Sequence, residues 1–170
     1  IVVHLREDRR HINDQDLVNL KKVIRNKFNL EMSINKKIVD VACRIKPDQS
    51  TLVPEKRQEL TTEGGLDVIR NFSRIKRVAL DLTQAGISVS LFIDPDIEQI
   101  KAVKDLGIEF VELHTGQYAN AQLLPKKKNF LKQIAKSVDY AKCLNINVFA
   151  GHGLDYDNVL AVRKLKSVEE

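Results

Sequence analysis

Short apolar runs rich in β-branched residues alternate along the chain with longer segments of helical period. The runs that predict strands are residues 1–5, 30–33, 51–53, 88–93, 110–113 and 147–150. Between them lie predicted helices at about 14–27, 35–45, 67–85, 96–106, 129–144 and 155–166. The segment 67–85 is the clearest helix, because its apolar residues recur at spacings of three and four.

Four of the predicted helices stop on a glycine or an asparagine, after which an apolar residue opens a strand. The four stops are Asn29, Gly86, Gly107 and Asn145. Glycine and asparagine tolerate the left-handed backbone conformation that ends many helices. The repeated joint predicts a series of βα units, and therefore parallel strands with right-handed helical crossovers.

Two α/β architectures fit this alternation, an open doubly wound sheet and a closed (β/α)8 TIM barrel. No glycine-rich phosphate fingerprint follows the first strand, which disfavours a dinucleotide-binding sheet. Residue 1 already lies in a strand and residue 170 follows a helix. We therefore expect residues 1–170 to form a single barrel domain that covers about strands 2 to 7, with the first and last strands missing. A six-strand open sheet remains the alternative.

Composition narrows the class of protein. The chain of 170 residues is 43% hydrophobic and 30% charged, which is typical of a globular domain with a sizeable core. No apolar run approaches the ~18 to 20 residues of a membrane span, and no basic-then-apolar leader is present. The only two cysteines, Cys43 and Cys143, lie far apart within predicted helices and make neither a disulfide framework nor a metal quartet. We expect a cytoplasmic protein with no membrane partner.

The net charge of +5 is compatible with nucleic acid, anionic lipid or small phosphorylated ligands. Aromatic residues make up only 5% of the chain and tryptophan is absent, which leaves few surfaces for stacking bases. The hypothesis of nucleic-acid binding therefore rests on net charge alone. Such binding would weaken steeply as the salt concentration rises. We favour small phosphorylated ligands and no nucleic-acid partner.

Ionisable residues follow or end every predicted strand, whereas the first residues of the strands carry none. At the carboxyl ends stand His4 with Arg6, Glu31, the charged segment 55–57, Asp94, Glu112 with His114, and His152. The working residues of parallel α/β folds lie at this end of the strands. The pattern predicts one site that contains several acid–base groups.

Single residues at these ends carry weaker signals. His4 and Arg6 share one strand face, so they suit proton transfer and phosphate binding, although a solvated edge fits equally well. Glu31 stands among apolar residues, where burial raises a carboxyl pKa and suits a general base. A salt bridge to an arginine of a neighbouring strand is the alternative. His152 lies between two glycines in "AGHGL", which let the backbone approach a ligand closely.

The longest irregular stretch runs from residue 54 to about 67. It contains hydroxyls, positive charges and a glycine pair, which suit a lid that closes over phosphate; a plain surface loop is the alternative. The four histidines lack ligand spacing such as HExxH, so we expect no metal site.

Several longer strings identify a family. These are "VHLREDRRHI", "NLEMS", "LVPEKRQELTTEGGLDV", "VSLFIDPD", "ELHTGQYA" and "NVFAGHGLDYDNV". In this order, from residue 1 to about 165, they resemble the pyridoxine 5′-phosphate synthases, the PdxJ family of bacterial vitamin B6 synthesis. The resemblance implies a (β/α)8 barrel and therefore favours the barrel over the open sheet.

The resemblance also implies a reaction. The family's enzymes are transferases that condense 3-amino-2-oxopropyl phosphate with 1-deoxy-D-xylulose 5-phosphate. They release pyridoxine 5′-phosphate, inorganic phosphate and water, and they use no metal and no organic cofactor. The resemblance further implies a homo-octamer assembled from dimers.

Roles carry over from the family by motif. His4 and Glu31 would be general bases, His152 the general acid, and Glu112 would stabilise charge in the transition state. The deoxyxylulose phosphate would bind to Arg6, His11 and Thr61, and the aminooxopropyl phosphate to the backbone of Gly153. All of these residue types stand at the matching positions.

Two other functions on the same fold remain open. A non-catalytic phosphosugar-binding barrel would bind one substrate and release no phosphate. A phosphosugar isomerase or aldolase would need a Schiff-base lysine within a strand, and neither Lys46 nor Lys56 is well placed for that role.

The family resemblance implies one strand before residue 1 and another after residue 170, both with substrate contacts. Residues 1–170 alone would then leave two edge strands unpaired, so we expect this piece to be inactive and poorly soluble. Turnover at the full level by a protein limited to these residues would contradict the expectation.

Overall fold

The computed structural model describes residues 1–54 and 64–169. Within them the chain forms one parallel sheet whose strands lie side by side in sequence order. The strands are β1 (Val2–Leu5), β2 (Asn29–Met32), β3 (Gln49–Leu52), β4 (Ser88–Ile93), β5 (Phe110–His114) and β6 (Asn147–Gly151). The strand runs of the sequence pattern are all confirmed, with shifts of one or two residues at their ends.

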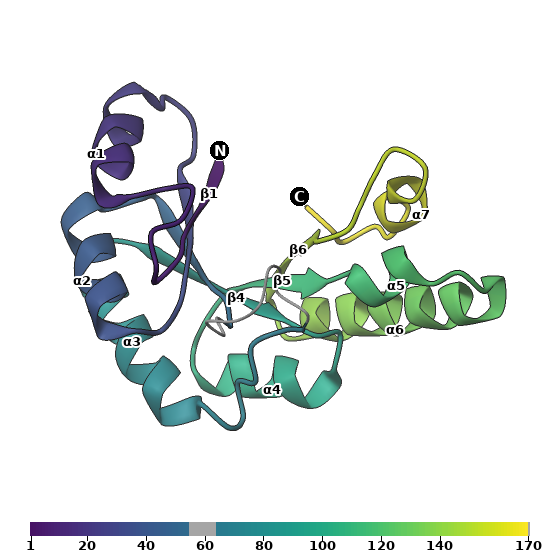
Figure 1. Cartoon of the computed structure of the whole chain (residues 1–170). Helices are drawn as coiled ribbons and strands as arrows, with labels where there is room; N and C mark the ends of the chain where they lie inside the picture. Colours follow the sequence, from purple (N-terminus) through teal and green to yellow (C-terminus); the bar gives the residue numbers. More distant parts are fainter. Residues whose placement is uncertain (55–63, 170) are drawn as a thin grey trace.

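The strand order decides between the two architectures. A doubly wound sheet reverses its order at a switch point, and helices then cover both of its faces. Here the order never reverses, and Figure 1 shows the sheet curving with its helices along the outer side. This is the arrangement of consecutive βα units in a (β/α)8 barrel. Over the described residues the chain is therefore a partial barrel with β1 and β6 at its edges.

Helices connect and cover the strands. They are α1 (Asp14–Val23), α2 (Lys36–Ile45), α3 (Phe72–Gln84), α4 (Ile97–Asp105), α5 (Gly116–Asn120), α6 (Leu124–Cys143) and α7 (Val159–Arg163). The sequence pattern missed the short α5 and placed the start of α6 too late. Pro125 is in the first turn of α6, where its missing N–H costs nothing. None of the helices within the described residues is long and apolar enough to cross a bilayer.

The start of α3 differs from the expected residue 67. The Asp67 carboxylate accepts the backbone N–H of Arg70 at 3.0 Å, and its carbonyl accepts the side-chain amide of Asn71 at 2.8 Å. These bonds close a turn before the helix. Val68 is fully buried whereas Ile69 is 53% exposed, so of the two apolar residues in this turn only Val68 packs into the core.

Three of the four predicted helix stops are confirmed, because Gly86, Gly107 and Asn145 all have positive φ angles. The prediction for Asn29 is wrong. Helix α1 has already ended at Val23, and Asn29 lies within β2, where its side-chain amide donates to Thr51 Oγ1 at 3.0 Å. An asparagine can serve as a cross-strand partner as readily as a helix stop, and the sequence does not distinguish the two.

The two faces of the sheet differ in chemistry. One face carries apolar side chains such as Leu30, Leu52 and Leu91, which join helical residues in a single buried core. The other face carries His4, Glu31 and Thr51, which lie in register across β1, β2 and β3. Because strand side chains alternate between faces, the polar residues point to the inner side of the curved sheet.

Lys27, which precedes β2, covers part of this inner side at the amino end of the strands. Its ammonium lies 4.9 Å from the ring centre of Phe149 and 5.7 Å from that of Phe110. The two rings are stacked with their centres 5.9 Å apart. A cation over aromatic faces is stabilising, so Lys27 and the two rings form a packed cluster at this end of the sheet.

The far end of the predicted lid is fixed to β4. Gly65 N donates to Asp94 Oδ1 at 3.0 Å, and Leu66 N donates to Phe92 O at 2.7 Å. A Cβ on Gly65 would collide with the backbone of Ile93 and Asp94. The glycine is therefore required for close approach to β4. The rest of the predicted lid, residues 55–63, lies outside the described residues.

This packing makes a prediction about stability. Gly65→Ala should lower the free energy of unfolding by about 1–3 kcal/mol, because the added methyl group must push two backbone segments apart. Gly64→Ala is the matched control, since its Cβ would meet only Asp94 Oδ2 at 3.6 Å. Urea denaturation of the full-length protein compares the two variants. Equal stability of both would contradict the close approach.

Candidate active site

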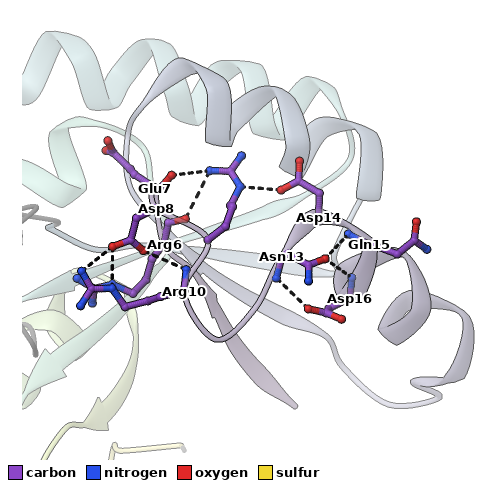
Figure 2. Close-up of polar contacts among 9 residues, drawn as sticks. Arg6, Glu7, Asp8, Arg10, Asn13, Asp14, Gln15 and Asp16 are labelled. Carbon is purple, nitrogen blue, oxygen red and sulfur yellow. Dashed lines mark hydrogen bonds and ion pairs between the residues drawn. The ribbon is translucent and has the colours of Figure 1, made fainter.

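The loop between β1 and α1 is held by its own ion pairs, as Figure 2 shows. Arg9 Nε donates to Asp14 Oδ1 at 2.7 Å, and Arg10 Nε donates to Asp8 Oδ2 at 2.7 Å. Arg9 also donates to the carbonyl of Glu7 at 3.0 Å. Two of the three arginines in "REDRR" therefore stabilise the loop itself, and the predicted anion-binding role remains with Arg6.

Neighbouring contacts fix where this loop begins and ends. The Asn13 side chain accepts the backbone N–H groups of Gln15 and Asp16 at the start of α1, and Asp16 accepts the N–H of Asn13 in return (Figure 2). The Glu7 carboxylate accepts Ser33 Oγ at 2.9 Å and Asn35 Nδ2 at 3.1 Å. The carboxyl ends of β1 and β2 are thereby tied together.

His4 and Glu31 form the first cluster of the site, with Arg6 beside them. They are register partners on β1 and β2, and His4 Nδ1 lies 3.7 Å from Glu31 Oε2. Burial, and secondarily the charge of Arg6, lower the pKa of His4 to about 4. Burial also raises the pKa of Glu31. At neutral pH the imidazole is uncharged, so its contact with Glu31 is not an ion pair.

This cluster can accept protons. A neutral imidazole has a free lone pair, and a carboxylate with a raised pKa is a stronger base than an exposed one. Within the described residues His4 Nε2 is buried and has no hydrogen-bond partner. An unsatisfied buried nitrogen is costly in a free protein and is typical of a position that a ligand completes.

The second cluster lies on β4, β5 and β6. His114 is 4% exposed, and its Nδ1 lies 3.0 Å from Asp94 Oδ1. The hydrogen bond from His114 lowers the pKa of Asp94, so this carboxyl is ionised at neutral pH. The ring of His152 lies with its centre 4.9 Å from that of His114. Partial burial and the neighbouring His114 lower the pKa of His152.

Glu112 extends across the carboxyl end of β6. It lies on β5 opposite Phe149, and its Oε1 contacts the backbone at Gly151 so closely that any side chain there would collide with it. The carboxylate therefore lies next to the segment that carries His152. Glu112 can take this position only because residue 151 is a glycine and has no side chain.

Most of the predicted site residues lie at the same edge of the sheet. His4, Arg6 and Glu31 come together at β1 and β2, while Glu112 and His152 come together at β5 and β6. Gly153 follows His152 with a φ of 78°. His11 lies apart in the β1–α1 loop with an exposed side chain. Thr61 is outside the described residues.

Sequence reasoning noted Asp94 and His114 at strand ends but assigned them no role. Their pairing was accessible in principle, because consecutive parallel strands are usually neighbours and both residues end their strands. No such signal marked Thr115, whose buried hydroxyl binds the backbone of residues 151 and 152. Within residues 1–54 and 64–169, no group of three His, Cys, Asp or Glu side chains is placed to hold a metal ion.

The first cluster predicts a pH dependence. The pKa of His4 is lowered in the folded state, so the unfolded chain binds the extra proton at higher pH than the folded chain. The free energy of unfolding is therefore at its full value above pH 6.5 as far as His4 is concerned. It falls as the pH drops toward 4, by up to about 3 kcal/mol.

NMR titration of the histidine ring carbons in the full-length protein measures this directly. His4 should titrate with a midpoint near pH 4, and Arg6→Gln should raise the midpoint because a nearby positive charge is removed. A midpoint for His4 above pH 6 would contradict the assignment.

Comparison with known proteins adds a family to this geometry. The family model described as "Pyridoxal phosphate biosynthesis protein PdxJ" matches residues 1–170. A pyridoxine 5′-phosphate synthase of Trichlorobacter lovleyi is 50% identical over the whole chain, which covers 71% of that protein. Proteins of the same name from Microcystis aeruginosa and Blochmanniella floridana are 51% and 46% identical, and the chain covers 71% and 69% of them.

Solved structures that resemble the chain support the fold alone. The tryptophan synthase A-subunit of Pyrococcus furiosus aligns with a TM-score of 0.57 at 14% identity, over 91% of this chain and 58% of that one. The S helix-GGDEF-EAL structure of Vibrio cholerae LapD aligns with a TM-score of 0.57 at 11% identity, over 91% of this chain and 37% of that one.

Proposed function

Because the chain belongs to the PdxJ family of pyridoxal phosphate biosynthesis proteins, we propose that it is a pyridoxine 5′-phosphate synthase. It is an enzyme of that biosynthesis, and more specifically a transferase that condenses 3-amino-2-oxopropyl phosphate with 1-deoxy-D-xylulose 5-phosphate. The observation that carries the proposal is the identity of about half of all residues, over the entire chain, to synthases from several bacteria.

The two clusters suit the chemistry of this condensation. Joining an amine to a ketone, losing water and phosphate, and making the ring aromatic require repeated proton transfers. His4 and Glu31 provide two proton acceptors on neighbouring strands. Burial and the charge of Arg6 keep the His4 imidazole unprotonated, and burial raises the pKa of Glu31 and makes its carboxylate a stronger base. Several acid–base groups around one edge of a barrel serve such a sequence better than a single nucleophile.

Charged substrates complete the opposite cluster. In the free protein the pKa of His152 is lowered, so its imidazole is mostly neutral at pH 7. A substrate phosphate bound at the backbone of Gly153 would place negative charge beside the ring, and this favours the protonated form that a general acid needs. Glu112, next to Gly151, would stabilise positive charge that develops on the amine-derived nitrogen.

Phosphate recognition would fall to Arg6, His11 and Thr61 for the deoxyxylulose phosphate. Arg6 is 9% exposed at the end of β1, and a guanidinium offers the forked donors that suit phosphate oxygens. The homo-octamer assembled from dimers that the family implies is part of the same proposal, and light scattering of the full-length protein tests it.

Phosphate release by the full-length protein tests the function. Inorganic phosphate should appear only when both substrates are present. Glu31→Gln and His152→Asn should each lower kcat by about 10²- to 10⁴-fold, the range for loss of one acid–base group. Glu112→Gln should also lower kcat, whereas Glu109→Gln, exposed before the amino end of the same strand, is the matched control and should not.

The outcomes separate the alternatives. Saturable binding of one substrate without phosphate release would identify a phosphosugar-binding barrel and remove the catalytic assignments. Release of phosphate that survives Glu31→Gln and His152→Asn would retain the synthase and reject these two residues as its acid–base groups.

A further inference from the structure

His152 adopts a backbone conformation that a non-glycine residue avoids. Its φ is 79°, and Gly153 follows with a φ of 78°. A side chain in this region costs of order 1 kcal/mol or more unless surrounding contacts stabilise it. The backbone of the "GHG" segment is therefore expected to be stabilised by contacts with residues elsewhere in the chain.

Thr115 supplies this support. Its Oγ1 lies 2.7 Å from the carbonyl oxygen of Gly151 and 2.8 Å from that of His152, so one hydroxyl proton serves both. The Thr115 backbone N–H also donates to Gly151 O at 2.9 Å. Thr115 is fully buried, so these bonds do not compete with water. Further along, the Asn158 amide donates to Gly153 O at 3.2 Å.

His114 contacts the imidazole of His152 from β5. Asp94 is ionised and can only accept, so the hydrogen bond of 3.0 Å places a proton on His114 Nδ1. This bond fixes the orientation of the ring, which also packs edge-on against Phe92 at 5.1 Å. Its Nε2 is buried, without a hydrogen-bond partner among the described residues, and lies on the side of Gly116 and His152.

Gly116 makes room for both rings. A Cβ at this position would lie 2.6 Å from His114 Nε2 and 3.1 Å from His152 Cδ2. Such distances are too short for a methyl group, so any side chain would displace one ring or both. The bare backbone of Gly116 thus lies directly against the two imidazoles.

We propose that the consecutive residues His114, Thr115 and Gly116 are positioning residues for His152, with Asp94 holding His114 in place. Thr115 fixes the strained backbone, His114 provides the wall against which the imidazole packs, and Gly116 sets the distance between the rings. The inference rests on the proposed function, because it takes His152 as the general acid of the synthase.

The contact has an electrostatic consequence. Nearness to His114, after burial, lowers the pKa of His152, so movement away from this wall should raise it. The other ionisable groups near this segment are Glu112 on β5, Tyr118 on α5, and Asp155 and Asp157 that follow His152. Tyr118 donates its hydroxyl to Asn158 O at 2.8 Å and therefore anchors the segment without contributing charge.

The test compares two substitutions at one position in the full-length protein. Thr115→Val keeps the shape and removes the hydroxyl, whereas Thr115→Ser keeps the hydroxyl. With Thr115→Val the titration midpoint of His152 should rise toward the ordinary 6.5, and kcat should fall about tenfold to a hundredfold with little change in KM. Thr115→Ser should retain both values.

Gly116→Ala is an independent second variant, and it should change the titration of His152 by displacing the ring. His4 lies in the other cluster and reports in the same spectra whether the fold is intact. An unchanged His152 midpoint in Thr115→Val, with His4 also unchanged, would overturn the proposal. Since the titration needs no turnover, it decides the positioning even if phosphate release fails and the proposed function falls.

Discussion

The parallel, sequential pairing of the strands is the constraint on which the rest of this structure depends. Each βα unit returns the chain to the same starting edge, so every strand ends at the opposite edge. Residues far apart in the sequence, such as His4 and His152, therefore lie at the same edge of the sheet. The alternation of side chains then divides each strand between an apolar outer face, packed under helices, and a polar inner face.

Burial gives the polar face its reactivity. The imidazole of His4 loses its charge, and the carboxyl of Glu31 holds its proton more strongly, because both are removed from water beside the end of a strand. A solvated pair at the same spacing would form an ordinary salt bridge. The positive charge of Arg6 adds to the effect of burial on His4, because it disfavours the protonated imidazole.

Glycines at this edge serve contact as well as backbone freedom. Gly65, Gly116 and Gly151 each lie where a Cβ would collide with a neighbouring segment or with a functional side chain. Gly116 and Gly151 lie against the groups argued to act in catalysis, and Gly65 joins the end of a long loop to the carboxylate that holds His114. The positions of the side chains in the candidate site thus depend on these glycines as well as on the contacts between the side chains themselves.

The sequence by itself determined the alternation of strands and helices, the parallel sheet and the family. It also determined that the ionisable residues gather at the carboxyl ends of the strands. These follow from local periodicity and from motifs, which are properties of short segments. It misplaced Asn29, which resembles a helix stop, and no sequence pattern showed that Arg9 and Arg10 form ion pairs within their own loop.

Only the tertiary structure decided which strand-end residues work together. The neutral state of His4, the pairing of Asp94 with His114 and the hold of Thr115 on His152 all depend on distances between segments that are remote in sequence. Such distances are set by strand register and by close backbone approach, and no local pattern records them. The residues of the candidate site could therefore be predicted from the sequence, whereas their charge states and their distances from one another could be known only from the folded structure.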